Sequence, residues 1–252
     1  MEIQYASDLH LEFTLNTYYL AEFKIIPKAE ILVLAGDIYL FCKNTDTVKF
    51  FDYLSKTFKQ VYWLPGNHEY YHSDIIRYHK FKANPIRHNI SVVNNEVVSI
   101  DGINLIFSTL WSHISPPNEL FIKSHVSDFS VISIDGDVFR PKHFNKLHNE
   151  SLEFITTELE NRKTEKNVVI THHVPTLMNY SEEYKKSSLN EAFVVELYDL
   201  IEKYQPECWI YGHSHYNAPE FTIGKTKLLT NQLGYVSMDE HKSFKLDAYI
   251  NI

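Results

Sequence analysis

The stretch ILVLAGD (residues 31–37) decides the fold class. It is apolar from Ile31 to Ala35 and then passes through a glycine to a single aspartate. An apolar run of this length, without polar alternation, is typical of a strand buried on both faces. Similar runs occur at 2–7, 61–66, 167–171 and 207–212. Each one ends at a residue with metal-binding chemistry, and these residues are Asp8, Asn67, His172 and His213.

Segments between these runs have helical periodicity. Apolar residues recur at spacings of three and four in 45–58, 144–160 and 190–204, which predicts helices there. Two hairpins are predicted: one pairs 96–100 with 103–107 across Asp101-Gly102, and the other pairs 218–223 with 226–230 across Gly224-Lys225. A further strand is predicted at 245–251. The alternation of strands and helices predicts an α/β (α+β) fold with a mixed sheet or two packed sheets and helices outside. We expect one domain over residues 1–252.

Two long stretches have no clear period. These are 111–143 and 174–189, and the second is largely polar. Long irregular segments within a compact domain often border a functional site. We therefore expect both to form walls of a pocket.

Composition narrows the class of protein. No apolar run approaches the ~20 residues of a membrane helix, and the N-terminus lacks the pattern of a secretory signal. Two distant cysteines, Cys42 and Cys208, fit a reducing compartment, so we expect a cytoplasmic protein that does not bind membranes. The formal charge of −8 argues against a dedicated nucleic-acid protein without excluding one. The sequence does not decide the oligomeric state.

The polar residues after the five apolar runs form the candidate site. Asp8-Leu9-His10 and His213-Ser214-His215 have the same spacing of two, which in an extended segment directs both side chains to one side. Sites in α/β sheets form where strands end. A mixed oxygen and nitrogen donor set suits manganese, iron or zinc, and the absence of a thiolate cluster argues against an all-sulfur structural zinc site.

The order of these motifs resembles that of the calcineurin-like metallophosphoesterases. The chain has DxH at 8–10, GD at 36–37, GNHE at 66–69, a strand-end His172 and GHSH at 212–215. NQLGY (231–235) resembles the NPRGY of bacterial members, but Gln232 and Leu233 replace the proline and arginine, which leaves the role of that arginine in doubt. The resemblance implies a double β-sandwich with flanking helices and a hydrolase with two divalent metal ions between the sheets.

The resemblance also implies roles for individual residues. The first metal would be held by Asp8, His10 and His215, the second by Asn67, His172 and His213, and Asp37 would bridge them. Two such ions would generate a bridging hydroxide that attacks a phosphomonoester or phosphodiester. His68 would face the substrate as general acid, which suits an imidazole. Glu69 is expected either to orient the His68 ring or to be an exposed charge.

Four further residues are weaker candidates for substrate binding. Trp111 and Asp128 resemble positions in the bacterial members whose loop borders the pocket. His173 follows His172 and is expected to be structural or to lie in the substrate pocket. Tyr39 is one of several aromatic residues near the motifs, which are either core residues or a stacking surface for a nucleobase.

The expected partner is therefore a small phosphorylated substrate, with a nucleotide or another small phosphodiester as candidates. Three other functions remain open. They are a metal-dependent nuclease, a non-catalytic interaction module on this fold, and a metal protein that handles redox chemistry or oxygen. The complete donor set and the separate His68 favour hydrolysis.

Overall fold

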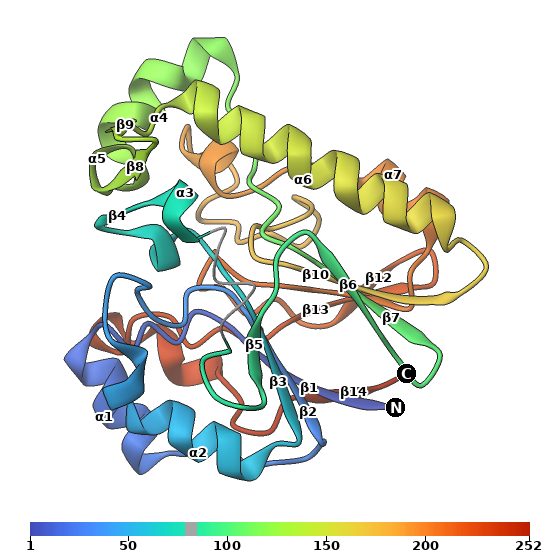
Figure 1. The fold of residues 1–252 in the computed structure, drawn as a ribbon. Coiled ribbons are helices and arrows are strands. Elements are labelled where there is room, and N and C mark those ends of the chain that lie inside the picture. Colours follow the sequence, from blue (N-terminus) through green and yellow to red (C-terminus); the bar gives the residue numbers. More distant parts are fainter. Residues whose placement is uncertain (79–84) are drawn as a thin grey trace.

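The computed structural model describes residues 1–78 and 85–252. Two large sheets contain most of the strands (Figure 1). The first sheet has the order β14-β1-β2-β3-β5. Its strands are β1 Glu2–Ala6, β2 Ile31–Ala35, β3 Gln60–Leu64, β5 Ile90–Val92 and β14 Tyr249–Asn251.

The second sheet has the order β12-β13-β11-β10-β7-β6. Its strands are β6 Glu96–Ile100, β7 Ile103–Ser108, β10 Lys166–Thr171, β11 Cys208–Tyr211, β12 Phe221–Ile223 and β13 Thr226–Thr230. The inner strands of both sheets pair in parallel, whereas β14, β6 and β12 are antiparallel edge strands. The hairpin predicted at 96–107 is therefore present, and the one predicted at 218–230 is present from Phe221 onward.

The two sheets face each other across an apolar layer. Val33 of β2, Phe107 of β7 and Ile170 of β10 belong to this layer, and all three are fully buried. Val169, next to Ile170, belongs instead to the cluster on the outer face of the second sheet. Because successive side chains of a strand point to opposite faces, β10 is buried on both. The double β-sandwich with helices outside is thus confirmed.

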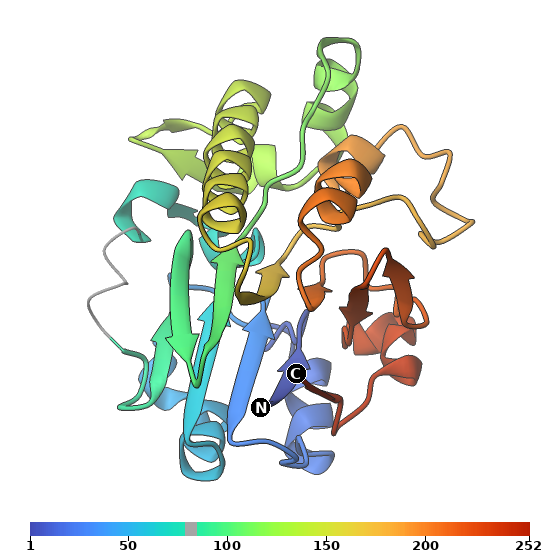
Figure 2. The same cartoon turned by 90° about the vertical axis from the view of Figure 1, so that its right-hand side faces the viewer.

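Helices cover the outer faces of both sheets (Figure 1). The helices α1 Thr14–Glu22 and α2 Lys49–Thr57 lie on the first sheet, where Phe51 stacks on Trp63 of β3. The helices α6 Pro141–Asn161 and α7 Tyr198–Tyr204 lie on the second sheet, where Ile155 and Ile201 are fully buried. Figure 2 shows the two chain ends side by side, and the Met1 amino group donates to the Ile252 carbonyl at 2.9 Å.

The helix predicted at 190–204 is only partly correct. Residues Asn190–Ala192 form one 3₁₀ turn, and the α-helix begins at Tyr198. Between them, Val194 bridges Val174 and the Phe193 ring stacks on His213 with centroids 4.8 Å apart. Tertiary contacts with the candidate site therefore override the local helical period.

The stretch 111–143 is more regular than its sequence indicates. It contains the helices α4 Glu119–His125 and α5 Asp128–Val131 and the short strands β8 Ile132–Ile134 and β9 Asp137–Val138. β8 pairs with β4 Ser73–Asp74 in a small third sheet. The short helix α3 Ile75–Tyr78 follows β4 directly. These elements are too short to give a readable hydrophobic period, since a period needs a window of about 11 residues.

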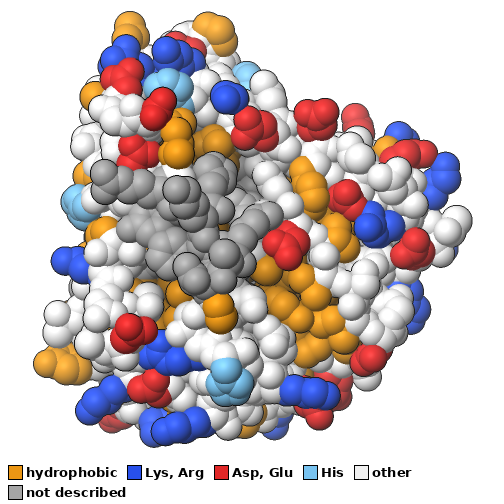
Figure 3. All heavy atoms as spheres, viewed as in Figure 1, with side chains coloured by type: hydrophobic (Ala, Val, Ile, Leu, Met, Phe, Trp, Pro, Cys, Tyr) orange, Lys and Arg blue, Asp and Glu red, His pale blue; other side chains and the backbone are white. Residues whose placement is uncertain are grey.

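On the face seen in Figure 3, lysine and arginine side chains are interspersed with aspartate and glutamate. None of the helices formed by the described residues combines the length and the apolar character needed to cross a bilayer.

Candidate metal centre

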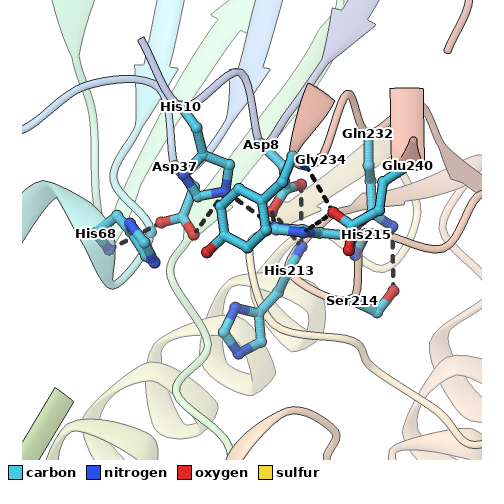
Figure 4. Close-up of polar contacts among 12 residues, drawn as sticks. Asp8, His10, Asp37, His68, His213, Ser214, His215, Gln232, Gly234 and Glu240 are labelled. Carbon is cyan, nitrogen blue, oxygen red and sulfur yellow. Dashed lines mark hydrogen bonds and ion pairs between the residues drawn. The ribbon is translucent and has the colours of Figure 1, made fainter. Parts of the chain in front are cut away.

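The candidate residues meet where parallel strands of both sheets end. Asp8 follows β1, Asp37 follows β2, His172 follows β10 and His213 follows β11. The carboxyl ends of these strands open on the same side of the sandwich, and Figure 4 shows His10 next to Asp37 and His215, with the His213 ring below them. Asp8, His10, Asp37, Asn67, His172 and His213 are all buried.

Asp8, His10 and His215 form one group of potential donors. One nitrogen or oxygen atom from each lies within 4.8 Å of the others. His215 Nε2 is 3.5 Å from Asp8 Oδ1 and 2.9 Å from His10 Nε2. Three donor atoms at this separation can coordinate a single cation.

Asp37, His172 and His213 form a second group with the same property. The Asn67 side-chain oxygen lies 3.2 Å from His172 Nε2, which adds an amide donor to this group. Asp37 also reaches the first group: its Oδ1 is 3.4 Å from His172 Nε2 and its Oδ2 is 3.8 Å from His10 Nε2. One carboxylate therefore presents one oxygen to each group.

The backbone of these residues is not extended. The prediction that an extended segment directs the side chains of each DxH and HxH pair to one side was therefore wrong. Asp8, His10, Asp37, His213 and His215 all have positive φ, between 47° and 73°. Left-handed conformation is uncommon outside glycine, and Asp and His are among the residues that tolerate it best. Each such residue costs on the order of 1–3 kcal/mol, a strain typical of functional sites. The side chains converge through left-handed turns and not through strand alternation.

Two glycines allow this close approach. A Cβ on Gly36, whose φ is 93°, would lie 2.1 Å from His172 Nδ1. A Cβ on Gly66 would lie 2.2 Å from Asp37 Oδ1. No side chain fits at either position, so the glycines of the GD and GNHE motifs leave space for the donor groups themselves.

Hydrogen bonds fix the orientation of each histidine in the two groups. His10 Nδ1 lies 3.0 Å from Glu12 Oε1, and His215 Nδ1 lies 2.7 Å from Glu240 Oε2. His172 Nδ1 is 2.9 Å from the Ala35 carbonyl oxygen. Carboxylates and carbonyls only accept, so these Nδ1 atoms carry the proton and leave Nε2 as the free donor atom. Histidines that ligate metals are held in this way.

His213 is held through its Nε2 atom and not through Nδ1. Its Nε2 lies 3.3 Å from the Ala192 carbonyl oxygen, so the proton sits on Nε2 and Nδ1 is the free atom. The turn at Asn190–Ala192 supplies this carbonyl, which explains why the chain leaves the predicted helix there.

His68 lies beside both groups and its backbone N–H donates to Asp37 Oδ1 at 2.9 Å. Its ring stacks on Tyr71 with centroids 4.0 Å apart, and its Nδ1 lies 2.9 Å from Glu12 Oε1. Burial opposes protonation of His68, but the Asp37 and Glu12 carboxylates outweigh it and raise its pKa to about 9. Figure 4 shows the ring at the edge of the group, next to Asp37.

Glu69 neither orients His68 nor lies exposed, so both expectations for it were wrong. The side chain is fully buried and accepts four N–H groups, from Asp37, Ile38 and Gly66 of the backbone and from the Trp63 indole. Burial, together with the charge of Asp37, raises the pKa of Glu69 to about 7. Glu69 therefore joins the loops that follow β2 and β3.

Asp128 lies beside Asn67. Its Oδ1 accepts from the Asn67 amide at 2.9 Å and from the Tyr71 hydroxyl at 2.8 Å. The bond to the amide nitrogen turns the Asn67 oxygen toward His172. Asp128 also lines the cavity described next.

A cavity of about 590 Å³ opens over the two groups. Both irregular stretches of the sequence contribute to its walls, with His125 to Asp128 from one and Tyr180, Tyr184 and Ser187 from the other. Phe13, Tyr71, Phe193 and Tyr235 add further aromatic surface. Of the described residues that line it, none is lysine or arginine.

Three of the weaker candidates are not among the residues that line this cavity. Trp111 is buried in the core against Phe144, with ring centroids 5.2 Å apart. His173 is fully buried behind His213, at a centroid distance of 4.1 Å. Tyr39 lies outside the lining, and its ring packs edge to face on Phe51 with centroids 6.4 Å apart. Gln232, at the place of the family's proline, is fully buried and accepts the His215 N–H at 2.6 Å. Leu233, at the place of the family's arginine, is fully buried in the core and offers no charge to the site.

Sequence reasoning did not identify Glu12 and Glu240. Glu12 follows His10 at the same spacing of two that relates His10 to Asp8, so DLHLE contained a signal for it. Glu240 lies 25 residues from its partner His215, and nothing in the local sequence connects them.

Comparisons with known proteins show which family the sequence resembles. The model of the calcineurin-like phosphoesterase family matches residues 1–217. An uncharacterized protein of Acanthamoeba polyphaga mimivirus is 34% identical to the chain, over 99% of this chain and 96% of the relative.

Two solved structures share the fold. A phosphopantetheinyl hydrolase from Mycobacterium tuberculosis superposes with a TM-score of 0.76 at 18% identity, covering 98% of this chain and 95% of its own. A dimetal phosphatase from Danio rerio has a TM-score of 0.54 at 14% identity, covering 92% of this chain and 87% of its own.

Proposed function

We propose, from the premise that this chain belongs to the calcineurin-like phosphoesterase family, that it hydrolyses a small phosphomonoester or phosphodiester with two divalent metal ions. The observation that carries the proposal is the position of Asp37. Its two oxygens face His172 at 3.4 Å and His10 at 3.8 Å, in two different donor groups. A carboxylate so placed suits a bridge between two ions.

The proton positions around the first group support a cation there. His10 and His215 each use Nδ1–H toward a carboxylate, so in the neutral rings both Nε2 atoms are bare acceptors, only 2.9 Å apart. Two lone pairs at this distance repel unless a proton or a cation lies between them. The neighbouring Asp8 oxygen makes a cation the natural occupant.

We assign Asp8, His10 and His215 to the first ion, Asn67, His172 and His213 to the second, and Asp37 to both. Oxygen and imidazole donors without thiolates suit manganese, iron or zinc. When bound, two such ions would polarise the phosphate and lower the pKa of a water near it. The protein's own contribution is to hold seven donor side chains at fixed angles through buried hydrogen bonds.

His68 supplies the proton in this proposal. Among the described hydrogen bonds, none joins a ring nitrogen of His68 to a donor atom of either group. Its Nδ1 faces Glu12, and the residue lines the cavity. The ring is therefore available to a substrate oxygen. A protonated imidazole can donate to the leaving alkoxide as its bond to phosphorus breaks.

The cavity favours a small substrate. Its volume of about 590 Å³ suits one ligand of moderate size, and its aromatic walls suit a planar or apolar group. A nucleotide or another small phosphodiester remains our candidate. We further propose a cytosolic location, because Cys42 and Cys208 are both free thiols, as is usual in a reducing compartment.

The same observations weigh against a nuclease and against a non-catalytic module. Nucleic-acid affinity comes largely from lysine and arginine, and the described lining of the cavity has neither. A module without activity has no need to keep seven donor residues and His68 together.

A direct assay tests the proposal. Metal content would be measured, and hydrolysis of para-nitrophenyl phosphate, its bis-ester and a panel of nucleotides followed after loading with manganese, zinc or iron. We expect about two ions per chain and turnover of at least one ester, both lost in Asp37→Ala. A fully loaded protein that cleaves none of these esters would contradict the proposal.

A further inference from the structure

Glu12 joins the two parts of the site. Its Oε1 lies 3.0 Å from His10 Nδ1 and 2.9 Å from His68 Nδ1, so a single oxygen faces both rings. The two rings meet edge to face with centroids 4.5 Å apart. The Glu12 side chain is about 10% exposed, and its other oxygen, Oε2, is buried and has no hydrogen-bond partner among the residues that the structure describes.

This arrangement fixes the proton positions on both rings. A carboxylate can only accept, so His10 and His68 must each present Nδ1–H to it. The remaining nitrogen of His10, Nε2, then points to His215 and Asp37. The same choice leaves Nε2 of His68 as the nitrogen available on the cavity side.

The cost of burying this carboxylate indicates that its position is not incidental. A buried charge is unfavourable unless it is well hydrogen-bonded, and here only one of the two oxygens is. Stability alone would favour an apolar residue or a fully paired carboxylate. Among the described residues, the hydrogen bonds of Glu12 go to a proposed metal ligand and to the proposed proton donor.

We propose that Glu12 is a positioning residue which sets the tautomer and the ring orientation of His10 and His68 together. This inference rests on the proposed function for its catalytic meaning, although the tautomers themselves do not depend on it. Glu12 thereby links the geometry of the first metal group to the placement of the proton donor. Glu12 is not among the described residues that line the cavity.

The first test reads the tautomers without any assay of activity. Long-range ¹H–¹⁵N spectra of the zinc-loaded protein report which nitrogen of each histidine carries hydrogen, with His10 and His68 assigned from His10→Ala and His68→Ala. We expect Nδ1–H on both rings in the wild type at about pH 10, above the His68 pKa of about 9, where the ring is neutral and has a defined tautomer. In Glu12→Ala, His68 should become a mixture of tautomers, whereas Glu12→Gln should keep Nδ1–H because its amide oxygen still accepts. Unchanged His68 signals in Glu12→Ala would overturn the proposal.

The second test uses the dependence of turnover on the leaving group. A nitrophenolate leaves readily without a proton, whereas an alkoxide needs one. Glu12→Ala should therefore slow alkyl esters at least tenfold more than nitrophenyl esters, and this excess should vanish in a His68→Ala background. An equal loss for both esters would mean that Glu12 acts only through His10.

Glu240→Ala is the matched control for Glu12→Ala. Glu240 holds His215 Nδ1 at 2.7 Å, as Glu12 holds His10, but it has no contact with His68 in the described structure. We expect weaker metal binding from this variant, with the His68 tautomer and the leaving-group dependence unchanged. If the wild type cleaves no ester but shows the predicted tautomers, the proposed function fails and the positioning role of Glu12 stands.

Discussion

The Glu69 carboxylate holds the backbone of Asp37, whose N–H it accepts at 3.0 Å through Oε2. The same oxygen accepts the Gly66 N–H at 2.7 Å, while Oε1 accepts the Ile38 N–H and the Trp63 indole. One buried side chain thus fastens the loop after β2 to the loop after β3. The two loops carry Asp37 and Asn67, so their separation depends on Glu69.

Glu69→Gln should weaken metal binding and lower stability together. Its amide nitrogen cannot accept, so two of the four N–H groups lose their partner, at a cost of about 1–3 kcal/mol each. We expect metal affinity to fall roughly 10–100-fold, as for other residues that orient ligands. Isothermal titration with zinc and thermal unfolding measure both effects. Glu153→Gln, on an exposed site of α6, is the control and should change neither.

His68→Ala should retain both metal ions and lose most turnover. The ring belongs to neither the Asp8 group nor the Asp37 group; its close neighbours with donor atoms are His10 and Glu12. We therefore expect metal content to stay near that of the wild type. A general acid typically supplies about 10²–10⁴-fold in rate, and that is the loss expected for esters with poor leaving groups. Parallel metal analysis and kinetics decide the point. Equal loss of metal and activity would make His68 a ligand instead.

Replacing His213 or His215 by alanine should weaken different ions. His213 belongs to the group with Asp37 and His172, and His215 to the group with Asp8 and His10. Each variant should bind one zinc ion nearly normally and the other at least tenfold more weakly. Stepwise titration with zinc shows which of the two binding steps is weakened in each variant. The absorption spectra of the cobalt-loaded variants then show which of the two sites is affected. His88→Ala, at an exposed histidine, should bind as the wild type does.

Gly66→Ala should displace the Asp37 carboxylate from its position between the two donor groups. The added Cβ would lie 2.2 Å from Asp37 Oδ1 and 2.6 Å from His172 Nε2, so at least one donor must move. A shift of this size in a close-packed site costs about 1–3 kcal/mol and misplaces atoms that must face an ion. We expect a folded protein by circular dichroism with sharply reduced metal content. Normal metal binding by this variant would show that Asp37 need not occupy its observed position.

Glu191 should make stability depend on pH. It accepts the Ser115 N–H at 2.7 Å, the Ser115 hydroxyl and the Asn118 amide, and so joins the segments 111–143 and 190–197 beside the cavity. Burial opposes ionisation, but these hydrogen bonds outweigh it and lower the pKa of Glu191. A depressed folded-state pKa means that the stabilisation is present above the unfolded pKa of about 4.3 and is lost as the pH falls through the folded value.

Glu191→Ala should therefore destabilise the protein by about 1–3 kcal/mol at pH 7. The difference from the wild type should shrink as the pH falls below about 4, where the wild-type carboxyl is protonated too. Urea unfolding at several pH values measures this. A difference that stays constant with pH would mean that Glu191 contributes by packing and not by charge.

The sequence alone indicated a layered α/β fold, because uninterrupted apolar runs such as ILVLA can be buried on both faces only between other layers. It left a mixed sheet and two packed sheets open, and the double sandwich was implied by the resemblance of the motifs to the family. It also indicated where the candidate donors lie, since Asp8, Asp37, His172 and His213 each follow such a run directly. The hairpins could be read for the same local reason: turn residues at Asp101-Gly102 and Gly224-Lys225 separate the paired strands. These features depend on residues close together in the chain.

Only the tertiary structure decided the features that depend on distant residues. The left-handed backbone of the donor turns is held by contacts such as the Asp8 carboxylate with the His213 N–H, 205 residues apart, and local spacing had suggested an extended chain instead. The partner of His68 proved to be Glu12 and not its neighbour Glu69, because a side chain's direction follows from the turn it sits in. Burial of Trp111 and His173 away from the cavity was likewise set by helix α6, whose Phe144 packs against both. Sequence pattern specifies which residues are buried and where strands end, whereas the positions of side chains in the site follow from packing between segments that the chain brings together only on folding.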